Sequence, residues 1–180
     1  RTDDFADSYS LMIEQDVSYT SNRIAKTSKK LRYHYRIHEI LEKSMNVQIP
    51  TQYAKIRDVK VQQHLDRTHV RMNRDVEFLE MDMKDNPDDP RLPYYMGETY
   101  LYLNDYENAY KWYLHRTKMA GFEEERYDAA YKVAVISDMY LQRKWDECHE
   151  LYLRAFEINP NRIDVLYQLS KHYYDTGFYS

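Results

Sequence analysis

The hydrophobic residues in the first third of the chain follow a period of two, which predicts short β-strands. Residues 7–14 and 31–38 alternate most clearly between apolar and polar side chains. Residues 19–24 alternate more weakly, and residues 59–64 alternate again, whereas residues 42–54 show no such period. This part of the chain is therefore expected to contain several short strands joined by irregular segments.

Helical spacing replaces alternation from about residue 66 onwards. The first helix is expected to begin at Asp66 or Thr68. Its apolar stripe runs along one face and consists of Met72, Val76, Leu79 and Met83. Asp89 followed by Pro90 is typical of the start of a second helix. Helix boundaries are expected near Asp85-Asn86-Pro87, Asn104-Asp105, Gly121, Lys144 and Pro160.

The predicted strand at 31–38 carries the densest group of candidate functional side chains. Its polar positions would share one face, and they are Arg32, His34, Arg36 and His38. Glu39 follows His38 directly. Adjacent strand residues point to opposite faces, so His38 and Glu39 can face one ligand only if the strand bends or ends there. A His-Glu pair alone is more often a chance neighbour pair than a catalytic one.

Composition narrows the classes of function. The chain has 180 residues and three glycines, which excludes a glycine-rich nucleotide loop. Its net charge is −4 with both signs interspersed, which argues against a nucleic-acid partner. No apolar run approaches the ~20 residues of a membrane span. The single cysteine, Cys148, excludes an intrachain disulfide and is consistent with a cytoplasmic location.

An internal repeat organises the helical part. The segment Tyr94–Tyr100, followed by Asp105–Ala109 and Tyr113, resembles a tetratricopeptide repeat, and a second copy ends near Pro160. A third copy begins at Ile163 and stops after its first helix. The small residues expected at the helix crossing are Ala109 and Cys148, and the matching aromatic residues are Tyr113 and Tyr152.

The repeat departs from the usual pattern between its first two copies. The spacing from Ala109 to Cys148 exceeds the usual ~34 residues. Arg116 stands where a small residue is normal, just before the extra residues. Because an unpaired charge there would be costly, Arg116 is expected to pair with Glu124 or Glu125. The acidic group Glu123, Glu124, Glu125 and Asp128 is interpreted as a solvated helix start, favoured by the helix dipole, rather than a cation site.

With both halves in view, the chain resembles a bacterial-type family 2 glycosyltransferase with an appended tetratricopeptide-like domain. The resembling segments are Arg32–Leu41, Arg74–Glu80 and the block from Asn86 to Tyr131, which includes Arg116 and the acidic insertion. The chain begins at Arg1 without Met and ends inside a periodic pattern, so it is expected to be a fragment. The resemblance places a sugar-nucleotide-binding half with an Asp-x-Asp metal motif upstream.

The resemblance implies an α+β fold that is mostly α. Residues 1–65 would be the C-terminal part of a GT-A-like catalytic domain, and residues 66–180 a tetratricopeptide-like α-solenoid of helical hairpins. The implied activity is metal-dependent, inverting transfer of a sugar from a nucleotide-sugar donor to a protein or glycan acceptor. The repeats would dock the acceptor or form a homodimer, and this fragment alone would be inactive.

The resemblance also implies roles for particular residues. His38 would contact Mn²⁺ or Mg²⁺, whose main ligands would lie upstream, and Glu39 would be the catalytic acid or base. Arg32, Arg36 and Arg23 would bind the phosphates of the donor.

The alternative is a non-enzymatic tetratricopeptide module that binds a partner protein. The strand-rich start of the chain weighs against it, because helical repeats need no such segment. Cys148 is expected to be a small core residue. The tyrosines of the first repeat are interpreted as packing residues rather than a sugar-stacking platform, and they are Tyr94, Tyr95, Tyr100, Tyr102, Tyr106, Tyr110 and Tyr113.

Overall fold

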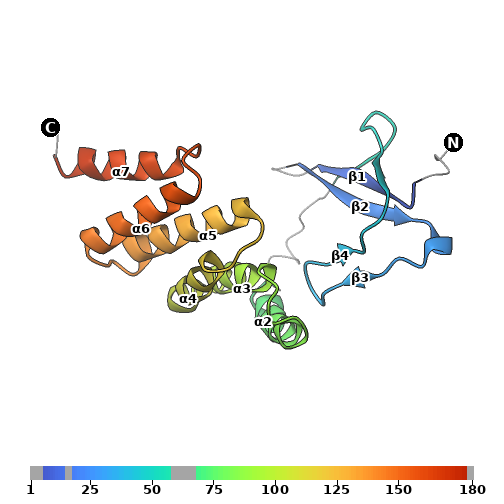
Figure 1. Ribbon diagram of the computed structural model, residues 1–180, viewed down its shortest axis with the longest axis horizontal. Coiled ribbons are helices and arrows are strands. Elements are labelled where there is room, and N and C mark those ends of the chain that lie inside the picture. The colour runs from blue at the N-terminus through green and yellow to red at the C-terminus, as the bar shows by residue number, and fades with distance from the viewer. Residues whose placement is uncertain (1–5, 15–17, 58–67, 178–180) are drawn as a thin grey trace. The chain divides into compact units, whose positions relative to one another are not determined.

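The computed structural model describes residues 6–14, 18–57 and 68–177. The chain divides into two compact units, Arg1–Thr68 and His69–Ser180. Strands make up the regular structure of the first unit and helices that of the second (Figure 1). The strand predicted at 59–64 and the predicted boundary between residues 65 and 66 lie outside the described residues.

Strand β1 (Ser8–Glu14) is the centre of the N-terminal sheet. Strand β2 (Tyr19–Ala25) pairs antiparallel along one edge of it. Two short strands, β5 (Asn46–Gln48) and β6 (Lys55–Arg57), pair parallel with β1 along the other edge, one after the other. The strands predicted at 7–14 and 19–24 are confirmed, whereas β5 lies inside the segment predicted to be irregular.

Both faces of the first half of β1 are buried. Tyr9, Leu11 and Ile13 are buried on one face, as alternation predicts. Ser8 and Ser10 are buried on the other, where Asn46 of β5 satisfies their hydroxyls. Ser8 Oγ donates to Asn46 Oδ1 at 3.1 Å, and Asn46 Nδ2 donates to Ser10 Oγ at 3.0 Å. These hydrogen bonds offset the cost of burying polar groups in the sheet.

The strand predicted at 31–38 is wrong beyond His34. After a short 3₁₀ turn, η1 (Thr27–Lys29), only β3 (Tyr33–His34) is extended, and it pairs antiparallel with β4 (Ile40–Leu41). The chain reverses between them because Tyr35 and His38 adopt φ angles of 69° and 51°. Alternation continued along the sequence, but these left-handed backbone angles do not continue a strand.

The helical unit contains α2 (Thr68–Asp85), α3 (Arg91–Tyr102), α4 (Tyr106–Thr117), α5 (Glu123–Val135), α6 (Trp145–Ile158) and α7 (Asp164–Asp175). A π-helical turn, η2 (Ile136–Tyr140), continues α5. The helix boundaries predicted from residue 85 onwards are confirmed, whereas the alternative start of the first helix at Asp66 lies outside the described residues. At the start of α3, Pro90 precedes the helix and Asp89 Oδ1 accepts a hydrogen bond from the Arg91 amide at 2.9 Å. No described helix is both long and apolar enough to cross a membrane.

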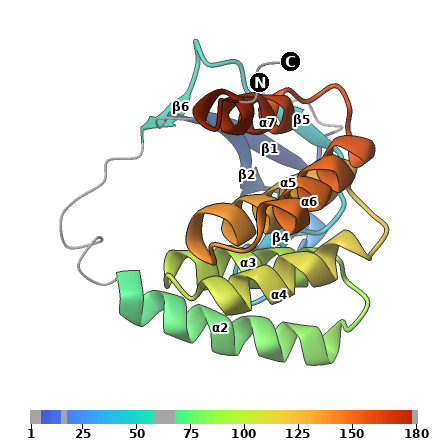
Figure 2. The same cartoon turned by 90° about the vertical axis from the view of Figure 1, so that its left-hand side faces the viewer.

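Successive helices pack as hairpins, α3 with α4 and α5 with α6, and α7 packs on α6 (Figures 1 and 2). The helices approach closely where small residues meet aromatic rings. A Cβ atom added to Gly97 would lie 2.7 Å from the Tyr113 ring, and Cys148 is fully buried beside Tyr152. This geometry is compatible with a tetratricopeptide-like α-solenoid, as the repeat predicts.

Most tyrosines of the first repeat pack between helices, as expected. Tyr113 is fully buried, and Tyr94, Tyr100, Tyr106 and Tyr110 pack against the same core cluster. Tyr102 differs, because 64% of its surface is exposed.

Arg116 is fully buried at the turn between α4 and α5. Its guanidinium donates to the carbonyls of Met119 (3.0 Å) and Phe122 (2.9 Å), and its Nε lies 3.7 Å from Glu125 Oε2. The predicted pairing is therefore with Glu125, while Glu124 pairs with Arg162. Burial lowers the pKa of Arg116 and raises that of Glu125, and the attraction between the two opposes both shifts.

Replacing this guanidinium should destabilise the helical unit. We expect Arg116→Met to lower the free energy of unfolding by about 3 kcal/mol, because it leaves the half-buried Glu125 without its cation and removes the donor for the carbonyls of Met119 and Phe122. The quantity is measured by urea denaturation. Arg116→Met combined with Glu125→Gln should recover part of the loss, and the exposed Arg154→Met should lose less than about 0.5 kcal/mol. Wild-type stability in Arg116→Met would show that the guanidinium does not hold the turn.

Candidate functional site

The predicted catalytic pair lies in the loop of the β3–β4 hairpin. His38 and Glu39 are both exposed there, and the positive φ of His38 places the bend at the first of them. The bend removes the objection that neighbouring strand residues must face opposite sides. Non-glycine residues in the left-handed region are costly and concentrate at functional sites, which makes this loop a candidate site.

The hairpin brings most of the predicted site residues onto one segment. Arg32 stands at its base, where the Arg32 amide donates to Glu42 Oε2 and the Glu42 amide donates to the Arg32 carbonyl, both at 2.9 Å. Arg36 lies in the loop with His38 and Glu39. Arg23 belongs to β2. The residue before it, Asn22, accepts a hydrogen bond at its carbonyl from Tyr33 Oη of the hairpin, at 3.4 Å. The predicted shared polar face is wrong, because the strand ends at His34.

The described residues do not form a complete metal site. Among residues 6–14, 18–57 and 68–177, no three His, Cys, Asp or Glu side chains are grouped so that they could hold a metal ion. His38 and Glu39 together could supply two ligands at most. A complete Mn²⁺ or Mg²⁺ site would need further ligands, which the family resemblance places upstream.

The acidic group at the start of α5 is paired, not merely solvated as predicted. Glu123 pairs with Arg126 at 3.1 Å, Glu124 with Arg162 at 3.2 Å, and Glu125 with Arg116. Asp128 pairs with Lys132 at 2.7 Å. Each carboxylate thus has a cation partner within the helical unit.

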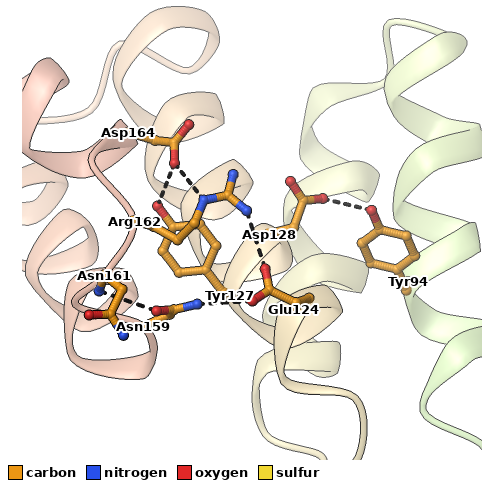
Figure 3. A network of polar contacts seen from close by, with 8 residues as sticks. All are labelled: Tyr94, Glu124, Tyr127, Asp128, Asn159, Asn161, Arg162 and Asp164. Carbon is orange, nitrogen blue, oxygen red and sulfur yellow. Dashed lines mark hydrogen bonds and ion pairs between the residues drawn. The ribbon is translucent and has the colours of Figure 1, made fainter. Parts of the chain in front are cut away.

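A recurring polar ladder joins the first helices of successive repeats (Figure 3). Tyr94 of α3 donates to Asp128 of α5 at 2.6 Å, and Tyr127 of α5 donates to Asp164 of α7 at 3.2 Å. A second rung follows one turn later at each interface: Glu98 contacts Lys132, and Gln168 donates to Tyr131 at 3.0 Å. The same arrangement is thus used twice, as a repeat architecture requires.

The ladder shifts the acidity of its members. Burial and the adjacent carboxylate raise the pKa of Tyr94 and of Tyr127, which keeps both hydroxyls protonated as donors. Burial disfavours the charged form of Lys132, but its contacts with Asp128 and Glu98 outweigh this and raise its pKa. The hydrogen bond from Arg162 lowers the pKa of Asp164. The ladder is therefore a set of mutually satisfied groups.

A groove lies where three consecutive helices meet. It has a volume of about 360 Å³ and is lined from α4 and the residue after it by Leu114, Thr117 and Lys118, from α5 by Arg126, Ala130 and Val133, and from α6 by Leu151, Arg154, Glu157 and Ile158. The α5 residues of the groove recur at helical spacing on the side opposite to the ladder residues Tyr127, Asp128 and Tyr131. Helix α5 thus has one internally paired face and one that borders the groove.

The groove residues were not recognised in the sequence. Leu114, Val133 and Leu151 look like ordinary core positions, and the hollow between them depends on how three helices pack. The unusual Arg116 and the insertion after it were a signal, because they mark the turn that sets the distance between α4 and α5.

The sequence matches no known protein family and no curated protein. Among solved structures, the chain is similar to one titled "MamA MSR-1 C2", with a TM-score of 0.47 and 23% sequence identity. The match covers 59% of this chain and 59% of that chain, so this chain spans less than two thirds of that structure. None of these comparisons supports a glycosyltransferase domain. The tetratricopeptide-like assignment rests on the chain's own helix pairs.

The ladder should contribute measurably to stability. We expect Asp128→Asn to lower the free energy of unfolding by about 1–2 kcal/mol, because Asp128 is the shared partner of Tyr94 and Lys132. Thermal and urea unfolding give the value. Glu150→Gln, at an exposed position of α6, is the matched control and should change stability by less than about 0.5 kcal/mol. Equal stability of the two variants would contradict a structural role for the ladder.

Proposed function

We propose that the helical unit is a protein-interaction module and that a segment of a partner protein binds in the groove between α4, α5 and α6. The observation that carries the proposal is the groove itself. It combines an apolar floor with polar side chains at its border, which is the usual composition of a binding site. Its volume of about 360 Å³ suits a few side chains of a partner.

The distribution of paired groups supports the groove over the opposite face of α5. On that face, Tyr94, Asp128 and Lys132 are already engaged with one another. A partner there would have to replace existing hydrogen bonds, which yields little net free energy. In the groove, a partner would instead cover apolar surface, which is the main source of affinity in most protein complexes.

Filling the groove should abolish partner binding. Peptides selected from a displayed random library on the wild-type protein, with counter-selection on Thr117→Trp, should bind the wild type in fluorescence anisotropy. Thr117→Trp should weaken that binding at least tenfold, because the indole would occupy the hollow. Lys111→Trp, at an exposed position of the same helix, is the matched control and should bind like the wild type. Failure to recover any such peptide would overturn the proposal.

A second proposal is that the N-terminal unit belongs to a glycosyltransferase. The observation that favours it is the left-handed backbone at Tyr35 and His38, which places the bend of an exposed hairpin at His38, directly before Glu39. In this proposal Glu39 exchanges a proton with the acceptor, His38 contributes to the metal or diphosphate contact, and Arg23, Arg32 and Arg36 bind phosphate. Arg116 and the acidic insertion after it are the further features of the resemblance.

The enzyme proposal is tested on a chain that includes the donor-binding half implied by the resemblance. There, His38→Ala should reduce sugar transfer from a nucleotide-sugar donor at least 100-fold, in the range typical of a lost catalytic group. His34→Ala, on the adjacent strand, should retain activity. The 180-residue chain alone should be inactive. Wild-type rates in His38→Ala would remove His38 from the site.

A further inference from the structure

We propose that the groove between α4, α5 and α6 recognises an acidic, apolar peptide segment, whose apolar side chains cover the floor and whose carboxylates bind Lys118 and Arg154. This inference rests on the proposed interaction function and adds the chemistry of the partner.

The floor requires an apolar partner group. The apolar surface that a partner can cover comes from the half-buried Leu114, Leu151 and Ile158, because Ala130 and Val133 of α5 are themselves almost fully buried. Covering this surface removes apolar area from water, which favours binding. A branched aliphatic or aromatic side chain fits this floor, whereas a purely charged segment would gain nothing from it.

The cations at the border require an anionic partner. Within the described residues, neither Lys118 nor Arg154 has a carboxylate within ion-pair distance, although both line the groove and are exposed. The third cation of the groove, Arg126, is held by Glu123 at 3.1 Å. Other arginines of the unit are also paired, Arg143 with Glu107 and Arg162 with Glu124 and Asp164.

The chain has a net charge of −4, so carboxylates outnumber cations, yet among the described residues no carboxylate lies within ion-pair distance of Lys118 or Arg154. The ends of α4 and α6 add partial negative charge near the groove, about half a unit for each helix. That charge favours cations at these positions but supplies no carboxylate. A partner carboxylate would therefore be the first full counter-ion for Lys118 or Arg154.

Glu157 allows a test in which the affinity should change in the opposite direction. It is the one acidic side chain among the described lining residues, and it makes no ion pair there with Arg154, three residues before it on α6. A carboxylate bound by Arg154 would be repelled by Glu157, since two negative charges brought close together lower the affinity. Neutralising Glu157 should therefore strengthen binding, whereas neutralising the cations should weaken it.

The test uses three fluorescent synthetic peptides and the 180-residue chain. The first peptide has a central leucine–phenylalanine pair flanked by aspartates and glutamates. The second replaces every acid by its amide, and the third replaces the leucine–phenylalanine pair by serines. Fluorescence anisotropy should show that the first peptide binds at least tenfold more tightly than either of the others, and that raising the salt concentration weakens it.

The variants locate the binding. Lys118→Gln and Arg154→Gln should each lower the affinity for the acidic peptide at least threefold, and together at least tenfold. Glu157→Gln should raise this affinity at least twofold. Lys111→Gln and Lys144→Gln, exposed lysines outside the groove lining, are the matched controls and should have no effect. Circular dichroism verifies that each variant is folded, and the single variants suffice if the double variant unfolds.

Several results would overturn the inference. Equal affinity for the acidic and amide peptides, or library-selected groove binders without acidic residues, would reject the acidic partner while leaving the groove as an interaction site. Self-association of the chain that Lys118→Gln abolishes would assign the groove to a second copy. Absence of any groove-binding peptide would reject the interaction function as well.

Discussion

A buried guanidinium joins the two helical pairs. Arg116 has no exposed surface, and it holds the turn after α4 through the carbonyls of Met119 and Phe122 while facing Glu125 at the start of α5. Because a buried charge must keep its partners, this turn has little freedom. The position of α5 follows from it, and α5 is the helix that borders both the polar ladder and the groove.

The two faces of α5 differ in how far their polar groups are satisfied. On the ladder face, a tyrosine donates to an aspartate at both interfaces, and Lys132 adds ion pairs at the first of them. Such a network stabilises the stacking of repeats and leaves little for a ligand. In the groove, Lys118 and Arg154 border apolar surface and have no carboxylate partner among the described residues. The groove, rather than the ladder face, is therefore the candidate binding site of the helical unit.

The candidate chemistry of the N-terminal unit lies in one hairpin with a left-handed backbone. Its sheet is conventional, since β1 buries apolar side chains on one face and serines satisfied by Asn46 on the other. The hairpin between β3 and β4 differs, because Tyr35 and His38 hold left-handed backbone angles without being glycine. The enzyme proposal depends on this loop and the interaction proposal does not, so the two can succeed or fail separately.

Local patterns in the chain were enough to predict the helix boundaries, the repeated hairpins and the pairing of Arg116 with the acidic insertion, because caps, prolines and helical periodicity act between near neighbours. The reversal at Tyr35 and His38 was not predictable, since left-handed angles are rare for tyrosine and, although enriched in histidine, still uncommon for it. The groove was equally hidden. Val133, Leu151 and Lys118 line one groove only when three helices pack. Whether a charged side chain has a partner likewise depends on which residues the tertiary structure places beside it.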